Sequence, residues 1–133
     1  MKKNKILLTL LILLTVSAMF YAFKPAGETW IETGLYFGMT KNSGGIVSQE
    51  EWDAFEDSVI VKVFSSGSTT IETRGRWLNE NGDVIKENSR VVMAVNKMTP
   101  ELSAQIDSIR EKYKKYFSQS SVLRIDRSAE VSF

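Results

Sequence analysis

The sequence predicts an α+β domain of the ferredoxin-like split β-α-β type, with a four-stranded antiparallel sheet and two helices on one face. Segments with a side-chain period of two and segments with apolar residues at helical spacing follow in the order strand, helix, strand, strand, helix, strand. The dipeptide Asn81-Gly82, between the second and third strands, is typical of a β-hairpin. The order of elements and the hairpin together favour this fold.

The first strand is expected to begin at Trp30 and end at Phe37, because side chains alternate in character there. One face carries Ile31, Thr33, Leu35 and Phe37. The other face carries Trp30, Glu32, Gly34 and Tyr36. We expect the first set to meet the helices, which leaves Glu32 and Tyr36 on the open side of the sheet.

The first helix is predicted to begin after Ser48, because Ser48 and Glu51 have the spacing of a capping box. Apolar side chains then recur at helical spacing as a buried stripe, at Trp52, Phe55 and Val59. The turn-forming residues 65–67 end this helix near Lys62.

A β-hairpin is expected next, with strands over residues 68–79 and 84–95. A two-residue turn at Asn81-Gly82 would form two neighbouring cross-strand pairs, Arg76 with Glu87 and Arg74 with Ser89. By the same alternation, three charged residues would share the open face: Glu72, Arg74 and Arg76.

The second helix is predicted to start at Thr99-Pro100-Glu101, which combines a capping residue with proline in the first turn. Its apolar stripe recurs every three or four residues, at Leu102, Ile106, Ile109, Tyr113 and Phe117. A last strand is expected over residues 122–127, and its extension by Val131 and Phe133 stays open. We expect Leu123 and Ile125 on its helix side, and Arg124 and Asp126 on its open side.

Polar side chains on the open face form the candidate ligand-binding site. They are Glu32, Tyr36, Glu72, Arg74, Arg76, Glu87, Ser89 and Arg124. One interpretation is a pocket for a small polar or anionic molecule, with Arg as the bidentate donor and Glu32 or Glu72 as a base. The other is a set of cross-strand ion pairs that stabilises the sheet without binding anything.

The function predicted from this face is non-catalytic binding of a small polar or anionic ligand, or of a partner. A homodimer formed by two such faces would cover Trp30, Tyr36 and Val91. Two alternatives stay open. One is a metal-independent enzyme that uses carboxylate, Tyr and Arg side chains, and the other is a structural protein of the cell envelope.

Composition excludes several kinds of chemistry. The chain has no Cys and no His, which excludes Cys/His zinc sites and Ser-His-Asp or Cys-His nucleophiles. We expect no metal and no cofactor. From Lys24 onward there are 14 basic and 16 acidic residues, a formal charge of −2, so nucleic-acid binding is not indicated.

Residues 1–23 predict export. Lys2, Lys3 and Lys5 precede a stretch without charges that ends at Phe23. This pattern fits a signal peptide cleaved after Ala18, and it equally fits an uncleaved membrane anchor. Either alternative places the folded part outside the cytoplasm, as a periplasmic, secreted or membrane-anchored domain. Residues 24–29 have the composition of a linker, and 30–133 have the length of a single domain.

Five short motifs occur in a fixed order along this domain. They are Leu35-Tyr36-Phe37-Gly38, Trp52-x-x-Phe55, Gly75-Arg76-Trp77, Glu87-x-Ser89 and the stretch from Tyr113 to Leu123. In this order they resemble a family of small exported bacterial proteins, domain of unknown function 3574. The resemblance runs from Thr29 to the end and implies export and one α+β domain. It implies no activity and no catalytic residues, although four residues match the family pattern: Tyr36, Trp77, Glu87 and Ser89.

Overall fold

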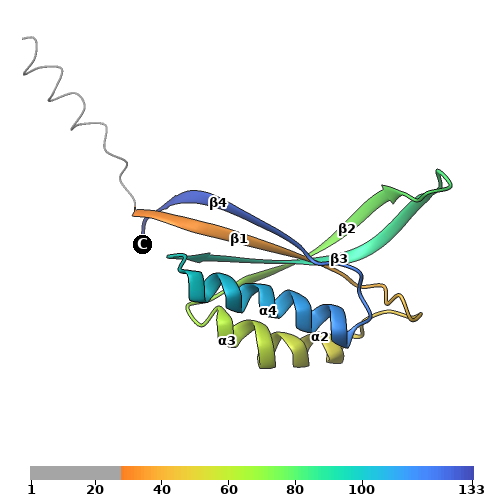
Figure 1. Cartoon of the computed structure of the whole chain (residues 1–133), viewed down its shortest axis with the longest axis horizontal. Coiled ribbons are helices and arrows are strands. Elements are labelled where there is room, and N and C mark those ends of the chain that lie inside the picture. The colour runs from red at the N-terminus through yellow and green to blue at the C-terminus, as the bar shows by residue number, and fades with distance from the viewer. Residues whose placement is uncertain (1–27) are drawn as a thin grey trace, which may run out of the picture. The chain divides into compact units, whose positions relative to one another are not determined.

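The structure, a computed structural model, describes residues 28–133, so the predicted signal or anchor segment and most of the linker lie outside the described residues. The elements are β1 (Glu28–Gly38), α2 (Gln49–Phe55), the π-helical η1 (Glu56–Ile60), α3 (Val61–Val63), β2 (Thr69–Leu78), β3 (Val84–Asn96), α4 (Pro100–Tyr116) and β4 (Leu123–Val131). The sheet order is β2-β3-β1-β4, and β3 is antiparallel to both β1 and β2. The helices lie on one face of this sheet (Figure 1). The predicted ferredoxin-like α+β fold is confirmed.

Both helices begin where the capping residues predict. The Ser48 hydroxyl accepts a hydrogen bond from the Glu51 N–H at 3.2 Å, and the Glu51 carboxylate accepts one from the Ser48 N–H at 2.9 Å. The first helix then continues through η1 and ends at Val63. At the start of α4, the Thr99 hydroxyl accepts from the Leu102 N–H at 3.1 Å. Among residues 28–133, no helix is both long and apolar enough to span a membrane.

An aromatic cluster fills the space between the helices and the sheet. Its members come from β1, α2 and the end of α4, and are Phe37, Trp52, Phe55, Tyr113 and Phe117. The Phe37 ring centroid lies 5.3 Å from that of Trp52 and 4.7 Å from that of Tyr113, in edge-on geometry. Each such pair adds about 0.5–1.5 kcal/mol beyond area burial. The Tyr113 hydroxyl donates to the Gly38 carbonyl at 2.7 Å, and burial raises the pKa of Tyr113. The core therefore holds the end of β1 in place.

The two faces of β1 are as the alternation predicts. Leu35 and Phe37 are fully buried in the core together with Thr33. Tyr36 points to the open side and is 39% exposed. Glu32 is half-buried on the same side and pairs with Arg127 of β4, at 2.6 Å between Oε1 and Nη2.

The predicted faces of β4 are reversed. Leu123 and Ile125 are 55% and 42% exposed, whereas the Arg124 side chain is only 11% exposed and pairs with Asp107 of α4 at 3.1 Å. Asp126 accepts a hydrogen bond from the Thr33 hydroxyl at 2.7 Å, on the helix side of the sheet. β4 is an edge strand beyond the aromatic core, and there α4 presents polar groups rather than apolar ones. A hydrogen-bonded ionic network therefore replaces the expected apolar contact.

The β2–β3 turn is longer than predicted. Asn79 and Asp83 close a three-residue loop, because the Asn79 N–H donates to the Asp83 carbonyl at 3.0 Å. The Asn79 side-chain oxygen also accepts from the N–H groups of Asn81 and Asp83, at 3.0 and 2.8 Å. Gly82 adopts a φ of 86°, the left-handed conformation that ends such loops.

This longer loop shifts the hairpin register by one residue. Arg74 lies opposite Asn88 and Arg76 lies opposite Lys86, instead of Ser89 and Glu87. Since a one-residue slip moves side chains to the other face, three predicted site residues leave the open face and lie on the helix side: Glu72, Arg74 and Arg76. Their predicted placement on the open face is wrong, and the loop length is the reason.

Candidate functional site

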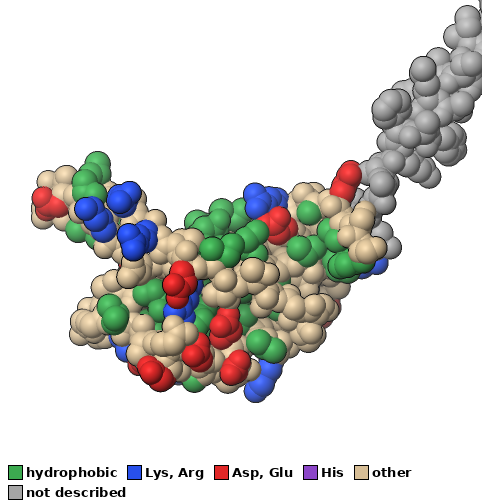
Figure 2. Space-filling view, turned by 180° about the vertical axis from the view of Figure 1, so that it is seen from behind, with side chains coloured by type: hydrophobic (Ala, Val, Ile, Leu, Met, Phe, Trp, Pro, Cys, Tyr) green, Lys and Arg blue, Asp and Glu red, His purple; other side chains and the backbone are tan. Residues whose placement is uncertain are grey.

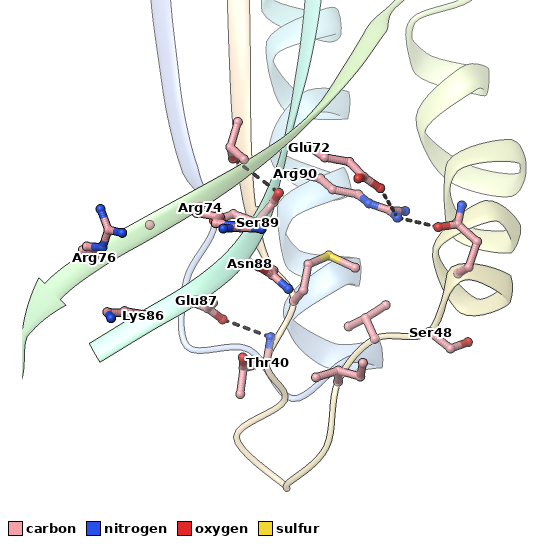
Figure 3. Close-up of a pocket in the computed structure, with 16 residues that line it drawn as sticks. Thr40, Ser48, Glu72, Arg74, Arg76, Lys86, Glu87, Asn88, Ser89 and Arg90 are labelled. Atoms are coloured by element: carbon pink, nitrogen blue, oxygen red, sulfur yellow. Dashed lines mark hydrogen bonds and ion pairs between the residues drawn. The ribbon is translucent and has the colours of Figure 1, made fainter. Parts of the chain in front are cut away.

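A cavity of about 910 Å³ lies between the β2–β3 hairpin and the chain that follows β1. β1 ends at Gly38, which pairs with Ser89, so among residues 28–133 no third strand lies beside the outer part of the hairpin. That outer part extends beyond the helices (Figure 1). Residues 72–76 and 86–90 form one wall, and residues 39–40 and 46–49 form the other (Figure 3).

Arg90 closes the inner end of the cavity. It is only 8% exposed, and its guanidinium lies 4.9 Å from the Trp52 ring centroid. Nη2 donates to Glu72 Oε1 at 3.0 Å and to Gln49 Oε1 at 2.5 Å. The charge of Arg90 is therefore matched by Glu72, and its position is set by β2, α2 and the core.

Three cations occupy the outer part of the same wall. Arg74, Arg76 and Lys86 are exposed and line the cavity. Because Arg76 and Lys86 are cross-strand partners and Arg74 is two residues along the strand, all three share one face. None of them forms an ion pair within residues 28–133. The space-filling view shows Lys and Arg side chains gathered on this projecting hairpin (Figure 2).

Glu87 fixes the opposite wall of the cavity to the hairpin. Its Oε1 accepts a hydrogen bond from the Thr40 N–H at 3.0 Å (Figure 3). The Gln119 side chain donates to the Thr40 carbonyl at 2.6 Å. A Cβ at Gly38 would lie 2.7 Å from Glu87 Oε1, so glycine leaves room for this carboxylate to cross the end of β1.

The predicted site residues divide among three places. Five of them line the cavity: Glu72, Arg74, Arg76, Glu87 and Ser89. Glu32 and Tyr36 are on the open face of the sheet. Arg124 is in the ionic network between β4 and α4. Ligand binding by these residues stays a prediction, but the eight do not form one site.

Sequence reasoning missed several residues of the cavity. Lys86, Asn88 and Arg90 were not recognised because the predicted register put Arg74 and Arg76 on the opposite face from them. In the structure all five residues share the helix side of the hairpin. Thr40 and Gln49 come from the loop and helix that the tertiary fold brings beneath the hairpin. In the sequence, only the turn indicates the correct register. Asn79 and Asp83 flank Asn81-Gly82 and can close a longer loop.

The residues that line the cavity include four cations, Arg74, Arg76, Lys86 and Arg90, and two carboxylates, Glu72 and Glu87. Within the part of the chain that the structure describes, no three Asp or Glu side chains gather in a way that could hold a metal ion. The two carboxylates in the cavity already have donors, Arg90 for Glu72 and the Thr40 N–H for Glu87.

A family model described as a protein of unknown function, DUF3574, matches residues 32–133. The chain belongs to the DUF3574 family. The resemblance stated from the sequence motifs is thereby confirmed. No functionally curated protein matches this DUF3574 chain.

Two solved structures of a phage SAM lyase are similar to the DUF3574 domain. The complex with S-methyl-5′-thioadenosine gives a TM-score of 0.55 at 14% identity, and covers 82% of this chain and 95% of the lyase chain. The apo structure gives a TM-score of 0.56 at 13% identity, and covers 84% and 97%. At these identities the similarity shows a shared fold.

Proposed function

We propose that this DUF3574 domain binds a small anionic ligand in the cavity beside the β2–β3 hairpin. The observation that carries the proposal is the group of three cations, Arg74, Arg76 and Lys86, on one wall and without a carboxylate partner among residues 28–133. Like charges opposite one another destabilise a sheet. A bound anion would remove that repulsion and would satisfy the planar donor groups of the two arginines.

The size and the walls of the cavity also support a small molecule. Its volume of about 910 Å³ is within the usual range of ligand pockets. The wall of residues 39–40 and 46–49 contains apolar and neutral polar side chains but no charged one. A ligand with an anionic group at the hairpin and an uncharged remainder against this wall would contact both surfaces.

Binding without catalysis fits the carboxylates better than acid–base chemistry does. Glu72 accepts a hydrogen bond from Arg90 and Glu87 accepts one from the Thr40 N–H, so each carboxylate already has a donor that stabilises its ionised form. The alternative, an enzyme, draws support from the lyase fold. The S-methyl-5′-thioadenosine bound to that lyase is a neutral nucleoside, however, and three cations offer it no charge to pair with.

Calorimetric titration of the purified protein with inorganic phosphate, succinate and S-methyl-5′-thioadenosine tests the proposal. We expect the two anions to bind, with an affinity that falls as salt is added. Arg76→Gln should weaken anion binding about ten-fold. Lys62→Gln, which removes an exposed cation outside the cavity, should leave it unchanged.

The enzyme alternative would be favoured by a different result, namely binding of the nucleoside and no binding of either anion. Export remains a prediction of residues 1–23, which lie outside the described residues. We propose that the anion site works outside the cytoplasm on that basis alone.

A further inference from the structure

The hairpin wall consists of three successive cross-strand pairs on one face. From the core outwards they are Glu72 with Arg90, Arg74 with Asn88, and Arg76 with Lys86. Neighbouring pairs are two residues apart along the strand, which corresponds to about 7 Å. The formal charge of these pairs rises from zero through one to two positive charges towards the turn.

The outer pair can hold one anionic group between two cations. Residues directly opposite in a hairpin have Cβ atoms about 5 Å apart, so the Arg76 guanidinium and the Lys86 ammonium can reach the same group. Arg offers a planar fork of donors and Lys a compact charge. This pair is the strongest anion position on the wall.

The middle pair can hold a second anionic group. Arg74 contributes one cation, and Asn88 opposite it contributes an amide donor. The inner pair cannot hold a third, because the Glu72 carboxylate already accepts from Arg90 at 3.0 Å and would repel another anion. The charges of the three pairs would therefore give this wall two anion positions.

Resting on the proposed function, we infer that the ligand is a small elongated dianion whose two anionic groups are about 7 Å apart. Its body between the two groups is neutral, because residues 39–40 and 46–49 opposite the hairpin include no charged side chain. A saturated α,ω-dicarboxylate is the simplest molecule with this chemistry.

Calorimetric titration with malonate, succinate, glutarate and adipate tests the spacing, with hexanoate as the monoanion matched in length to adipate. Affinity should rise along the series, and adipate should bind about ten-fold more tightly than hexanoate. Arg74→Gln should reduce the ratio of the adipate affinity to the hexanoate affinity about ten-fold. Arg74→Lys should restore part of the ratio, and Lys62→Gln should change neither affinity. Circular dichroism confirms that each variant is folded.

Equal affinities for adipate and hexanoate would overturn the proposal of a dianionic ligand but would leave an anion site in place. An affinity that does not depend on the chain length of the dicarboxylate would do the same. Adipate selectivity that survives in Arg74→Gln would overturn it as well. Failure of every carboxylate and of phosphate to bind the folded protein would instead overturn the proposed function.

Discussion

Lys86 lies directly across the hairpin from Arg76, and both side chains are on the cavity side of the strands. Two like charges at opposite positions cost stability, by the same order as opposite charges would add, about 0.2–1 kcal/mol. The fold keeps this arrangement at the mouth of a cavity, where a ligand can reach both cations. The pair therefore links the stability of the hairpin to the proposed binding of anions.

The first prediction is that Arg76→Glu raises stability and abolishes anion binding. The new carboxylate would face Lys86 across the hairpin and should add about 0.2–1 kcal/mol to the free energy of unfolding. Urea denaturation measures the stability, and calorimetry measures the binding. Lys62→Glu serves as the control, and a loss of stability in Arg76→Glu would contradict the unfavourable pairing.

The second prediction concerns Gly38. A Cβ there would lie 2.7 Å from Glu87 Oε1 and 3.1 Å from Gln119 Oε1, so Gly38→Ala should displace Glu87 and break its hydrogen bond to the Thr40 N–H. We expect a loss of about 0.5–1.5 kcal/mol in the free energy of unfolding and weaker anion binding, because the cavity wall is no longer tied to β3.

Gly34→Ala is the matched control for that change, because its added Cβ would meet the Tyr36 ring at an ordinary contact distance of 3.4 Å. Denaturation curves of the two variants should differ. Similar stabilities would show that the contact at Gly38 is not what constrains this position.

The third prediction is that removing Arg124 destabilises the domain. Its side chain is 11% exposed and pairs with both Asp107 and Asp126, and it also donates to the Ser103 carbonyl at 3.1 Å. Arg124→Ala would leave these acceptors poorly satisfied and should cost about 2 kcal/mol. Thermal unfolding measures the loss. Arg127→Ala, at a pair on the exposed side of β4, should cost under about 1 kcal/mol.

The fourth prediction is a loss of stability in acid. Hydrogen bonds from Arg110, and then from Arg124, hold the pKa of Asp107 below its usual value of 3.8. A depressed folded-state pKa gives stability that is present above the unfolded-state pKa and is lost as pH falls through the folded-state value. The melting temperature should therefore drop below about pH 4, and Asp107→Asn should flatten part of that drop. An unchanged profile in this variant would contradict the assignment.

The fifth prediction is the homodimer expected from the sequence. Val91, which was expected to stand exposed, is only 7% exposed. Other apolar side chains are exposed on the open face of the sheet, among them Tyr36, Ile71, Leu123 and Ile125, and pairing of two copies would cover them. Light scattering should give twice the mass of the chain. Ile125→Glu should yield a monomer, whereas a monomeric wild-type protein at high concentration would count against the dimer.

The sequence by itself determined the order of elements, the helix starts at Ser48 and Thr99, and the faces of β1. These features depend on interactions over a few residues, namely capping hydrogen bonds and the alternation of apolar and polar side chains. The family also follows from the sequence, because several motifs occur in a fixed order.

Only the tertiary structure decided the face of β4 and the register of the hairpin. The sequence pattern predicts Leu123 and Ile125 to be core residues. However, β4 lies at the edge of the sheet, where α4 presents Ser103 and Asp107 instead of an apolar surface. The hairpin register depends on one additional loop residue, and a single slip exchanges the two faces of β2. Because the cavity forms where this hairpin passes the end of β1, its residues could be gathered only by packing between segments far apart in the chain.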